Sequence, residues 1–334
     1  MSTSYGLKEL NFETTIGGVG GENNRREIPV IDLSDFDNRR AEITDQLWFA
    51  ATEIGFFQLV NHGMDVADIL TAFDASERFF ALEKTQKAQY PLKDGLNAGW
   101  EFMAQVRPST GTADQKESYQ ITLPHMDGLW PNQTVVPDFQ RIVLDFEQRA
   151  WSLGMKVLSC FADRLGFERD FFTKAHDRSS ADYQSTLRLL HYLPLADGAE
   201  PEPGIWRAGA HTDFDCLTMV FQKEGQGGLQ VCPGKEAMAS GAQEWTSVVP
   251  KDGVITCNIG DMLMRWSDDK LLSTLHRVRM PKADEPKGPR YSMAFFCQAN
   301  KDQLIQGPEK KYEPITARDY LLQRINANFA GKKA

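Results

Sequence analysis

The stretch that decides the fold runs from Trp206 to Val231, WRAGAHTDFDCLTMVFQKEGQGGLQV, and its chemical centre is the HTD motif of His211 and Asp213. Successive side chains of a β-strand alternate between its faces, so these two residues are expected to project from the same face. A third ligand must come from elsewhere, and His276 lies in another strand-like run. Two histidines and one carboxylate form the ligand set of a ferrous site with open coordination positions. The sequence therefore predicts a metal site.

A His-x-Asp motif on its own is more often a turn or a surface pair than a metal site. Here further features follow in a consistent order. Gly260 and Asp261 are expected to open a strand ahead of His276, and Arg290 and Ser292 come after it. Chance rarely supplies all of these features together.

These motifs resemble those of the 2-oxoglutarate and Fe(II)-dependent dioxygenases of the isopenicillin N synthase-like group. The resemblance extends over most of the chain. It is carried by IPVID (28–32), GFFQLVNHG (55–63), HTD (211–213), GGLQV (227–231), NIGD (258–261), HRV (276–278) and RYS (290–292). Within the family, fungal thymine hydroxylases are the most similar in LRLLHY (187–192), RWSD (265–268) and PRYSMAFFC (289–297).

The resemblance implies that His211, Asp213 and His276 bind Fe(II), with 2-oxoglutarate and O2 as co-substrates. It implies oxidation of a small organic molecule, a pyrimidine or a specialised metabolite, with release of succinate and CO2. Hydroxylation is the default outcome, and related enzymes also desaturate, cyclise or expand rings. Two alternatives remain open: a 2-oxoglutarate-independent oxidase of the same fold, and a non-catalytic metal-binding sensor.

The resemblance also assigns a site for 2-oxoglutarate. Arg290 would receive the far carboxylate, and Ser292 shares its strand face and can add a hydroxyl donor. Tyr192 stands where the family often has a tyrosine that contacts 2-oxoglutarate. The chain departs from the family twice: Leu190 replaces an asparagine common in plant members, and Asp215 replaces a frequent glycine. Asp215 is either a fourth ligand or, as we expect, a turn-stabilising residue.

Residues in predicted loops and near the motifs are candidates for the substrate pocket. The arginines among them could hold an anionic or carbonyl-bearing substrate, although each could equally be a surface ion-pair partner. The candidates are Phe102, Met103, Arg107, Tyr119, Arg188, Trp206, Arg207 and Phe214.

Hydrophobic periodicity predicts a mainly β fold with flanking helices, an α+β class whose core is an antiparallel sandwich or a jelly roll. Helical spacing is expected over 40–53, 65–82 and 137–165, and irregular structure over 95–120. A closing helix is expected over 316–330, with Thr316 as its N-cap. Eight short strands are expected at 186–192, 217–221, 229–231, 245–249, 254–258, 262–266, 275–280 and 290–297. The resemblance makes this core a double-stranded β-helix.

The chain is expected to divide into a flexible leader (1–27), a helical amino-terminal region (28–184), the catalytic core (185–300) and a carboxy-terminal helix on or over the core (301–334). Its 334 residues and 41% hydrophobic content suit a globular protein with a large core.

A formal net charge of −9 argues against nucleic acid as a partner, because nucleic-acid binders concentrate lysine and arginine. Five cysteines without CxxC spacing argue against a zinc site and a disulfide framework. Neither a signal peptide nor a membrane span is evident in the sequence. We therefore expect a cytoplasmic enzyme with a small-molecule substrate, and the sequence does not indicate its oligomeric state.

Overall fold

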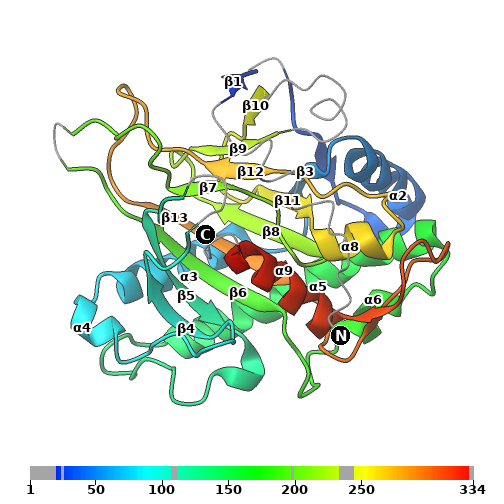
Figure 1. The fold of residues 1–334 in the computed structure, drawn as a ribbon, viewed down its shortest axis with the longest axis horizontal. Helices are drawn as coiled ribbons and strands as arrows, with labels where there is room; N and C mark the ends of the chain where they lie inside the picture. Colours follow the sequence, from blue (N-terminus) through cyan, green and yellow to red (C-terminus); the bar gives the residue numbers. More distant parts are fainter. Residues whose placement is uncertain (1–19, 24–25, 107–110, 197–198, 233–243, 331–334) are drawn as a thin grey trace.

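The computed structural model describes residues 20–23, 26–106, 111–196, 199–232 and 244–330, with side chains as far as residue 325. Two β-sheets form its centre (Figure 1). The larger has eight strands, in the spatial order β2 (Val30–Asp32), β3 (Phe56–Val60), β11 (Ile255–Ile259), β8 (Leu217–Gln222), β13 (Arg290–Cys297), β6 (Thr186–Tyr192), β5 (Lys116–Ile121) and β4 (Gly99–Phe102).

The smaller sheet has five strands and faces the larger one. Their order is β1 (Gly21–Glu22), β10 (Glu244–Ser247), β9 (Leu229–Val231), β12 (His276–Val278) and β7 (Ala208–His211). One apolar cluster joins Leu190 and Ala294 of the large sheet to Val231 and Val278 of the small one. The predicted jelly-roll core with flanking helices is therefore confirmed.

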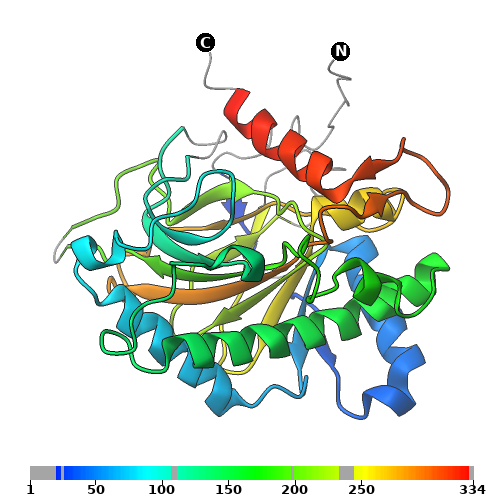
Figure 2. The same ribbon diagram turned by 90° about the horizontal axis from the view of Figure 1, so that it is seen from below.

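Helices cover the outer face of the large sheet. Figure 2 shows α5 and α3 side by side beneath it, with the closing helix α9 on the opposite side. The helical segments are α2 (Phe36–Glu53), α3 (Val66–Phe80), α4 (Lys84–Lys87), the 3-10 turn η1 (Leu123–His125), α5 (Phe139–Leu165), α6 (Phe171–Ala175), α8 (Asp261–Trp266) and α9 (Ala317–Ala330). The strands β14 (Leu304–Ile305) and β15 (Ile315–Thr316) form a small separate pair before α9. In the part of the chain that is described, we find no helix with the length and apolar character needed to cross a bilayer.

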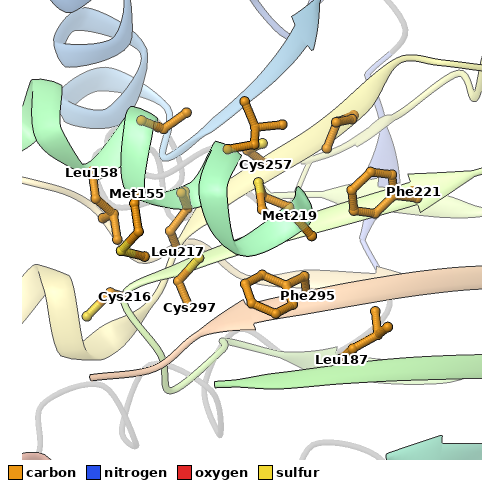
Figure 3. Packing of buried hydrophobic residues seen from close by; sticks show 14 of the residues in the cluster. Met155, Leu158, Leu187, Cys216, Leu217, Met219, Phe221, Cys257, Phe295 and Cys297 are labelled. Atoms are coloured by element: carbon orange, nitrogen blue, oxygen red, sulfur yellow. The ribbon is translucent and has the colours of Figure 1, made fainter. Parts of the chain in front are cut away.

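The contact between α5 and the large sheet depends on one glycine. A Cβ placed on Gly154 would lie 2.5 Å from the Sγ of Cys297 and 3.4 Å from the Cε of Met219. Figure 3 shows Cys297 and Met219 in the apolar layer beneath the helix. The missing side chain therefore lets α5 approach β13 closely.

The predicted helices over 40–53, 65–82 and 137–165 correspond to α2, α3 and α5. A side chain caps the first turn of two helices, and one of these caps is the predicted Thr316. The Asp65 side chain accepts a hydrogen bond from the backbone N–H of Ala67 at the start of α3. The Thr316 hydroxyl accepts one from the backbone N–H of Asp319 at the start of α9. Both serve as N-caps by satisfying backbone donors that the first turn leaves unpaired.

Two local predictions were wrong. The segment 95–120 is not irregular throughout, because it contains β4 and β5, which complete the large sheet. The segment 262–266 is not a strand, because Asp261 begins the short helix α8 after an extended Gly260. A Cβ on Gly260 would lie 2.2 Å from the backbone oxygen of Asp215, so the chain turns here in tight contact with the loop after β7.

Candidate active site

The two histidines of the predicted metal site come from adjacent antiparallel strands. His211 ends β7 and His276 begins β12, and their Cα atoms are paired in register. The centroids of the two imidazole rings lie 4.3 Å apart. Cross-strand pairing thus brings together two side chains that are far apart in sequence.

Asp213 lies beside the histidines, but it is not on the same strand as His211, where alternation had predicted it. β7 ends at His211, so Asp213 lies in the following loop. Its Oδ2 accepts hydrogen bonds from the Thr218 hydroxyl at 2.7 Å and from the Asn258 amide at 2.9 Å. Its backbone oxygen accepts one from the N–H of Asp261 at 2.8 Å. The carboxylate is therefore positioned by β8, β11 and α8 rather than by its own strand.

The geometry of the three residues fits one metal ion. The Nε2 atoms of His211 and His276 lie 3.8 and 3.6 Å from the carboxylate oxygens of Asp213. All three ligand atoms lie within 4.8 Å of one another, and no second such group of three occurs in the described ranges.

Each imidazole is also held at its other nitrogen. Nδ1 of His211 lies 2.7 Å from the Gly209 carbonyl, and Nδ1 of His276 lies 3.4 Å from that of Thr274. An Nδ1–H that donates to a carbonyl leaves the Nε2 lone pair available to a metal. Two neutral imidazoles and one carboxylate on one side of an ion suit Fe(II), with positions left for other ligands.

Asp215, the departure from the family, stands beside this group. Its carboxyl is buried and its oxygens lie 3.1 and 3.2 Å from the Thr218 hydroxyl. Burial, and next the charge of Asp213, raise the pKa of Asp215 well above its usual range. It is not among the three clustered ligands, and its backbone oxygen accepts a hydrogen bond from the N–H of Met262. These contacts agree with the expected turn-stabilising role.

The predicted 2-oxoglutarate residues also meet in the structure. Arg290 begins β13 and is paired in register with Tyr192 of β6, and its guanidinium lies 4.6 Å from the Tyr192 ring. Nη1 of Arg290 donates to the Ser292 hydroxyl at 3.3 Å, and Nη2 donates to Oε1 of Gln222 at 2.9 Å. Only 1% of Arg290 is exposed, and burial lowers its pKa. This buried cation faces the space between the two sheets. Leu190 lies opposite Ser292 in the same layer.

Three substrate-pocket candidates lie near this space. Arg188 donates to Oε1 of Gln120 at 2.7 Å and lies over the ring of Phe296 at 5.1 Å. Arg207 is buried and is close enough to Arg290 for their charges to interact. The ring of Phe214 lies 4.7 Å from the guanidinium of Arg324, which bonds to Thr212 between the two ligands.

The other candidates are placed differently. The ring of Tyr119 packs on Phe79 and Phe139, and that of Phe102 lies under the ammonium of Lys84. Both rings therefore face the helices, on the side of the large sheet away from the three clustered ligands, and the structure does not bring them to the predicted pocket.

Trp206 also lies apart from the three clustered ligands. It stacks on Arg277, whose side chain leaves β12 on the face opposite to His276. The backbone N–H of Met103, which follows β4, donates a hydrogen bond to the carbonyl of Lys116. Arg107 lies outside the described residues.

Several supporting residues were missed by the sequence analysis. The hydroxyl of Thr212, between two ligands, donates to Asp261 at 3.0 Å and accepts from Arg324 of α9 at 3.1 Å. Arg324 also forms a fully buried ion pair with Asp261 at 2.5 Å. Asn258 and Asp261 belong to the NIGD motif (258–261), so the sequence did mark these two residues. Nothing in the local sequence marked Arg324.

Comparisons with known proteins agree with this geometry. The family described as the 2OG-Fe(II) oxygenase superfamily matches residues 183–299, and the non-haem dioxygenase N-terminal family matches residues 28–135. The proline hydroxylase buaE of Petromyces alliaceus is 30% identical over 329 residues, covering 90% of this chain and 98% of that protein. The 2-oxoglutarate-Fe(II) type oxidoreductase hxnY of Emericella nidulans is 30% identical and covers 87% of each chain.

A solved structure is similar as well. The crystal structure of a full-length thymine hydroxylase from Neurospora crassa, in complex with alpha-KG and thymine, superposes with a TM-score of 0.79 at 29% identity. The match covers 92% of this chain and 99% of that one.

Proposed function

Because the chain belongs to the 2OG-Fe(II) oxygenase superfamily, we propose that His211, Asp213 and His276 hold its ferrous ion. We propose further that Arg290, Ser292 and Tyr192 receive 2-oxoglutarate. The protein is an enzyme of the 2-oxoglutarate-dependent dioxygenase type, with Fe(II) and O2 as the further requirements of its reaction. The observation that carries the residue assignment is the approach of three ligand atoms to within 4.8 Å of one another.

Bound Fe(II) supplies the chemistry that couples oxidative decarboxylation of 2-oxoglutarate to oxidation of a substrate C–H bond. The chain's own residues orient and protect the reactants. Arg290 fixes the far end of the dicarboxylate, and Ser292 adds a hydroxyl to the same end. The cluster that includes Leu190, Val278 and Ala294 is buried between the sheets and excludes water.

We propose that the substrate is a small molecule that carries a carbonyl or carboxylate group beside a flat or apolar body. This proposal is supported by Arg188 and Gln120, which share one face of the large sheet with the ring of Phe296. A guanidinium and an amide can hydrogen-bond carbonyl oxygens, and an aromatic ring offers a stacking surface. Pyrimidines and cyclic amino acids fit this description, as do related specialised metabolites.

Two further aspects of the function are proposals. The net charge of −9 supports a small-molecule substrate rather than nucleic acid. The five cysteines are buried and free, which agrees with a reducing compartment, and we propose the cytoplasm.

Turnover assays test the proposed function. Purified enzyme with Fe(II), ascorbate and 2-oxoglutarate is incubated with a panel of pyrimidines and amino acids, and succinate and oxidised product are both quantified. We expect one succinate for each oxidised substrate. Oxidised product without succinate would instead identify an oxidase whose Arg290 binds the substrate's own carboxylate. Metal binding without consumption of 2-oxoglutarate across the panel would identify a non-catalytic sensor.

A further inference from the structure

We propose that Arg207 is a second guanidinium in the site for the distal carboxylate of 2-oxoglutarate, and that it makes the enzyme selective for dicarboxylic 2-oxo acids. The inference rests on the proposed function, because it extends the site of Arg290 and Tyr192. It assigns Arg207 to the co-substrate rather than to the oxidised substrate.

Both arginines are buried cations without an ion pair among the described residues, although the charge of Glu285 acts on Arg207 from beyond ion-pair distance. Arg207 is 4% exposed and Arg290 is 1% exposed. Arg207 donates one hydrogen bond, from Nη2 to the carbonyl of Gly288 at 2.9 Å, and its buried Nε has no partner. Among the described side chains, no carboxylate lies within ion-pair distance of either guanidinium. A buried charge without a counter-charge destabilises the folded protein, because it has lost its contacts with water. A bound anion would therefore stabilise both buried guanidinium groups.

The side chain of Arg207 also reaches the chain just ahead of Arg290. Gly288, which accepts from Arg207, is two residues before Arg290. The Tyr192 phenol acts electrostatically on both arginines. Burial, and next the positive charge of Arg290, lower the pKa of Arg207 to about 10. Two like charges in a buried site are stabilised most by an anion that contacts both.

The position of this anion site suits the far end of a keto-diacid. Arg207 immediately precedes β7, the strand that ends with His211, and Arg290 starts β13. The site therefore lies between a strand that carries a metal ligand and the strand that carries the predicted carboxylate-binding residues. A carboxylate offers two oxygens with about four lone-pair positions, enough to accept from both guanidinium groups and a hydroxyl.

A ligand comparison tests the proposal. Wild type, Arg207→Gln and Arg207→Lys are loaded with Fe(II) under anaerobic conditions. Dissociation constants are then measured by calorimetry for 2-oxoglutarate and for 2-oxopentanoate, in which a methyl group replaces the distal carboxylate. Arg207→Gln should weaken 2-oxoglutarate binding by about 10- to 100-fold, the usual range for a hydrogen bond to a charged group. Binding of 2-oxopentanoate should change by less than about twofold, since it lacks the group that Arg207 contacts.

Thermal stability supplies a second readout. Without ligand, Arg207→Gln should melt no lower than wild type, because the substitution removes one of two like charges. The increase in Tm on adding 2-oxoglutarate should be smaller in the variant. Arg40→Gln, which breaks a partly exposed ion pair with Asp163, serves as the matched control and should behave as wild type.

Unchanged 2-oxoglutarate affinity in Arg207→Gln would overturn the inference. An equal loss for both 2-oxo acids would also overturn it, because general damage to the site affects both. Failure of the proposed function would give a different result, because the wild-type enzyme itself would then bind Fe(II) but not 2-oxoglutarate.

Discussion

His211 and His276 occupy directly paired positions on β7 and β12, with their ring centroids 4.3 Å apart. Phe56 of β3 packs edge-on against the His276 ring at 5.6 Å. The two imidazoles are thus fixed by strand register and packing, whereas Asp213 depends on hydrogen bonds from neighbouring strands. Disturbing those hydrogen bonds should affect the metal site before it affects the fold.

Removal of either side-chain donor to Asp213 should weaken metal binding. Thr218→Val and Asn258→Leu each delete one hydrogen bond to Oδ2 of Asp213. Loss of such a supporting contact typically costs about 10- to 100-fold in metal affinity. Fe(II) or Mn(II) affinity measured by calorimetry would show this. Thr186→Val is the matched control, because this buried hydroxyl on β6 bonds to Thr122 instead, and equal loss in the control would count against the assignment.

Substitution of Arg290 should weaken the binding of 2-oxoglutarate without weakening the binding of Fe(II). Arg290→Ala removes a buried guanidinium that Ser292 and Gln222 hold in place. The dissociation constant for 2-oxoglutarate should rise more than about tenfold, and that for Fe(II) should change little. Titrating each separately under anaerobic conditions tests this. Equal effects on both constants would show that Arg290 supports the fold and not the dicarboxylate.

Gly154→Ala should destabilise the contact between α5 and β13. The new Cβ would lie 2.5 Å from the Sγ of Cys297, and overpacking of this kind costs about 1–3 kcal/mol. In a Cys297→Ala background the same change should become neutral or stabilising by up to about 1 kcal/mol, because alanine favours a helix. Urea unfolding of the four proteins in this cycle measures the coupling. Additive effects would mean that the clash is relieved elsewhere.

His176 should make the fold sensitive to acid. It is fully buried, and burial lowers its pKa from 6.5 to about 4. Below pH 6.5 the unfolded chain binds a proton that the folded protein excludes, so stability falls as pH falls. Between pH 6.5 and about pH 5 this contributes about 2 kcal/mol. The pH dependence of unfolding should be shallower in His176→Gln by this amount, and parallel curves would contradict the assignment.

The metal ligands could be predicted because their chemistry is concentrated in short motifs. The reason given for Asp213 was nevertheless incomplete, since the strand ends at His211. Strand alternation predicted that Asp213 would join the histidines, whereas in the structure long-range hydrogen bonds place it beside them. Contacts of this kind, such as that of Arg324 with Asp261, leave no local signal.

The position of Tyr119 has a physical explanation. All six residues of β5 are buried, because one face meets the helices and the other the space between the sheets. When both faces of a strand are buried, the alternation of polar and apolar residues does not show which side chains face the helices and which face the other sheet. The sequence therefore did not indicate that Tyr119 faces the helices. The apolar run of α8 was misread for a related reason, since a segment of six residues does not distinguish a buried strand from a helix.

The most direct test of the central claim is anaerobic titration of the Fe(II)-loaded protein with 2-oxoglutarate, followed by visible absorption. We predict that wild type develops the charge-transfer band of a 2-oxoglutarate chelate on iron and that His211→Ala and Asp213→Ala, folded by circular dichroism, do not. Absence of the band in wild type, or a full band in either ligand variant, would contradict the assignment of iron to these residues.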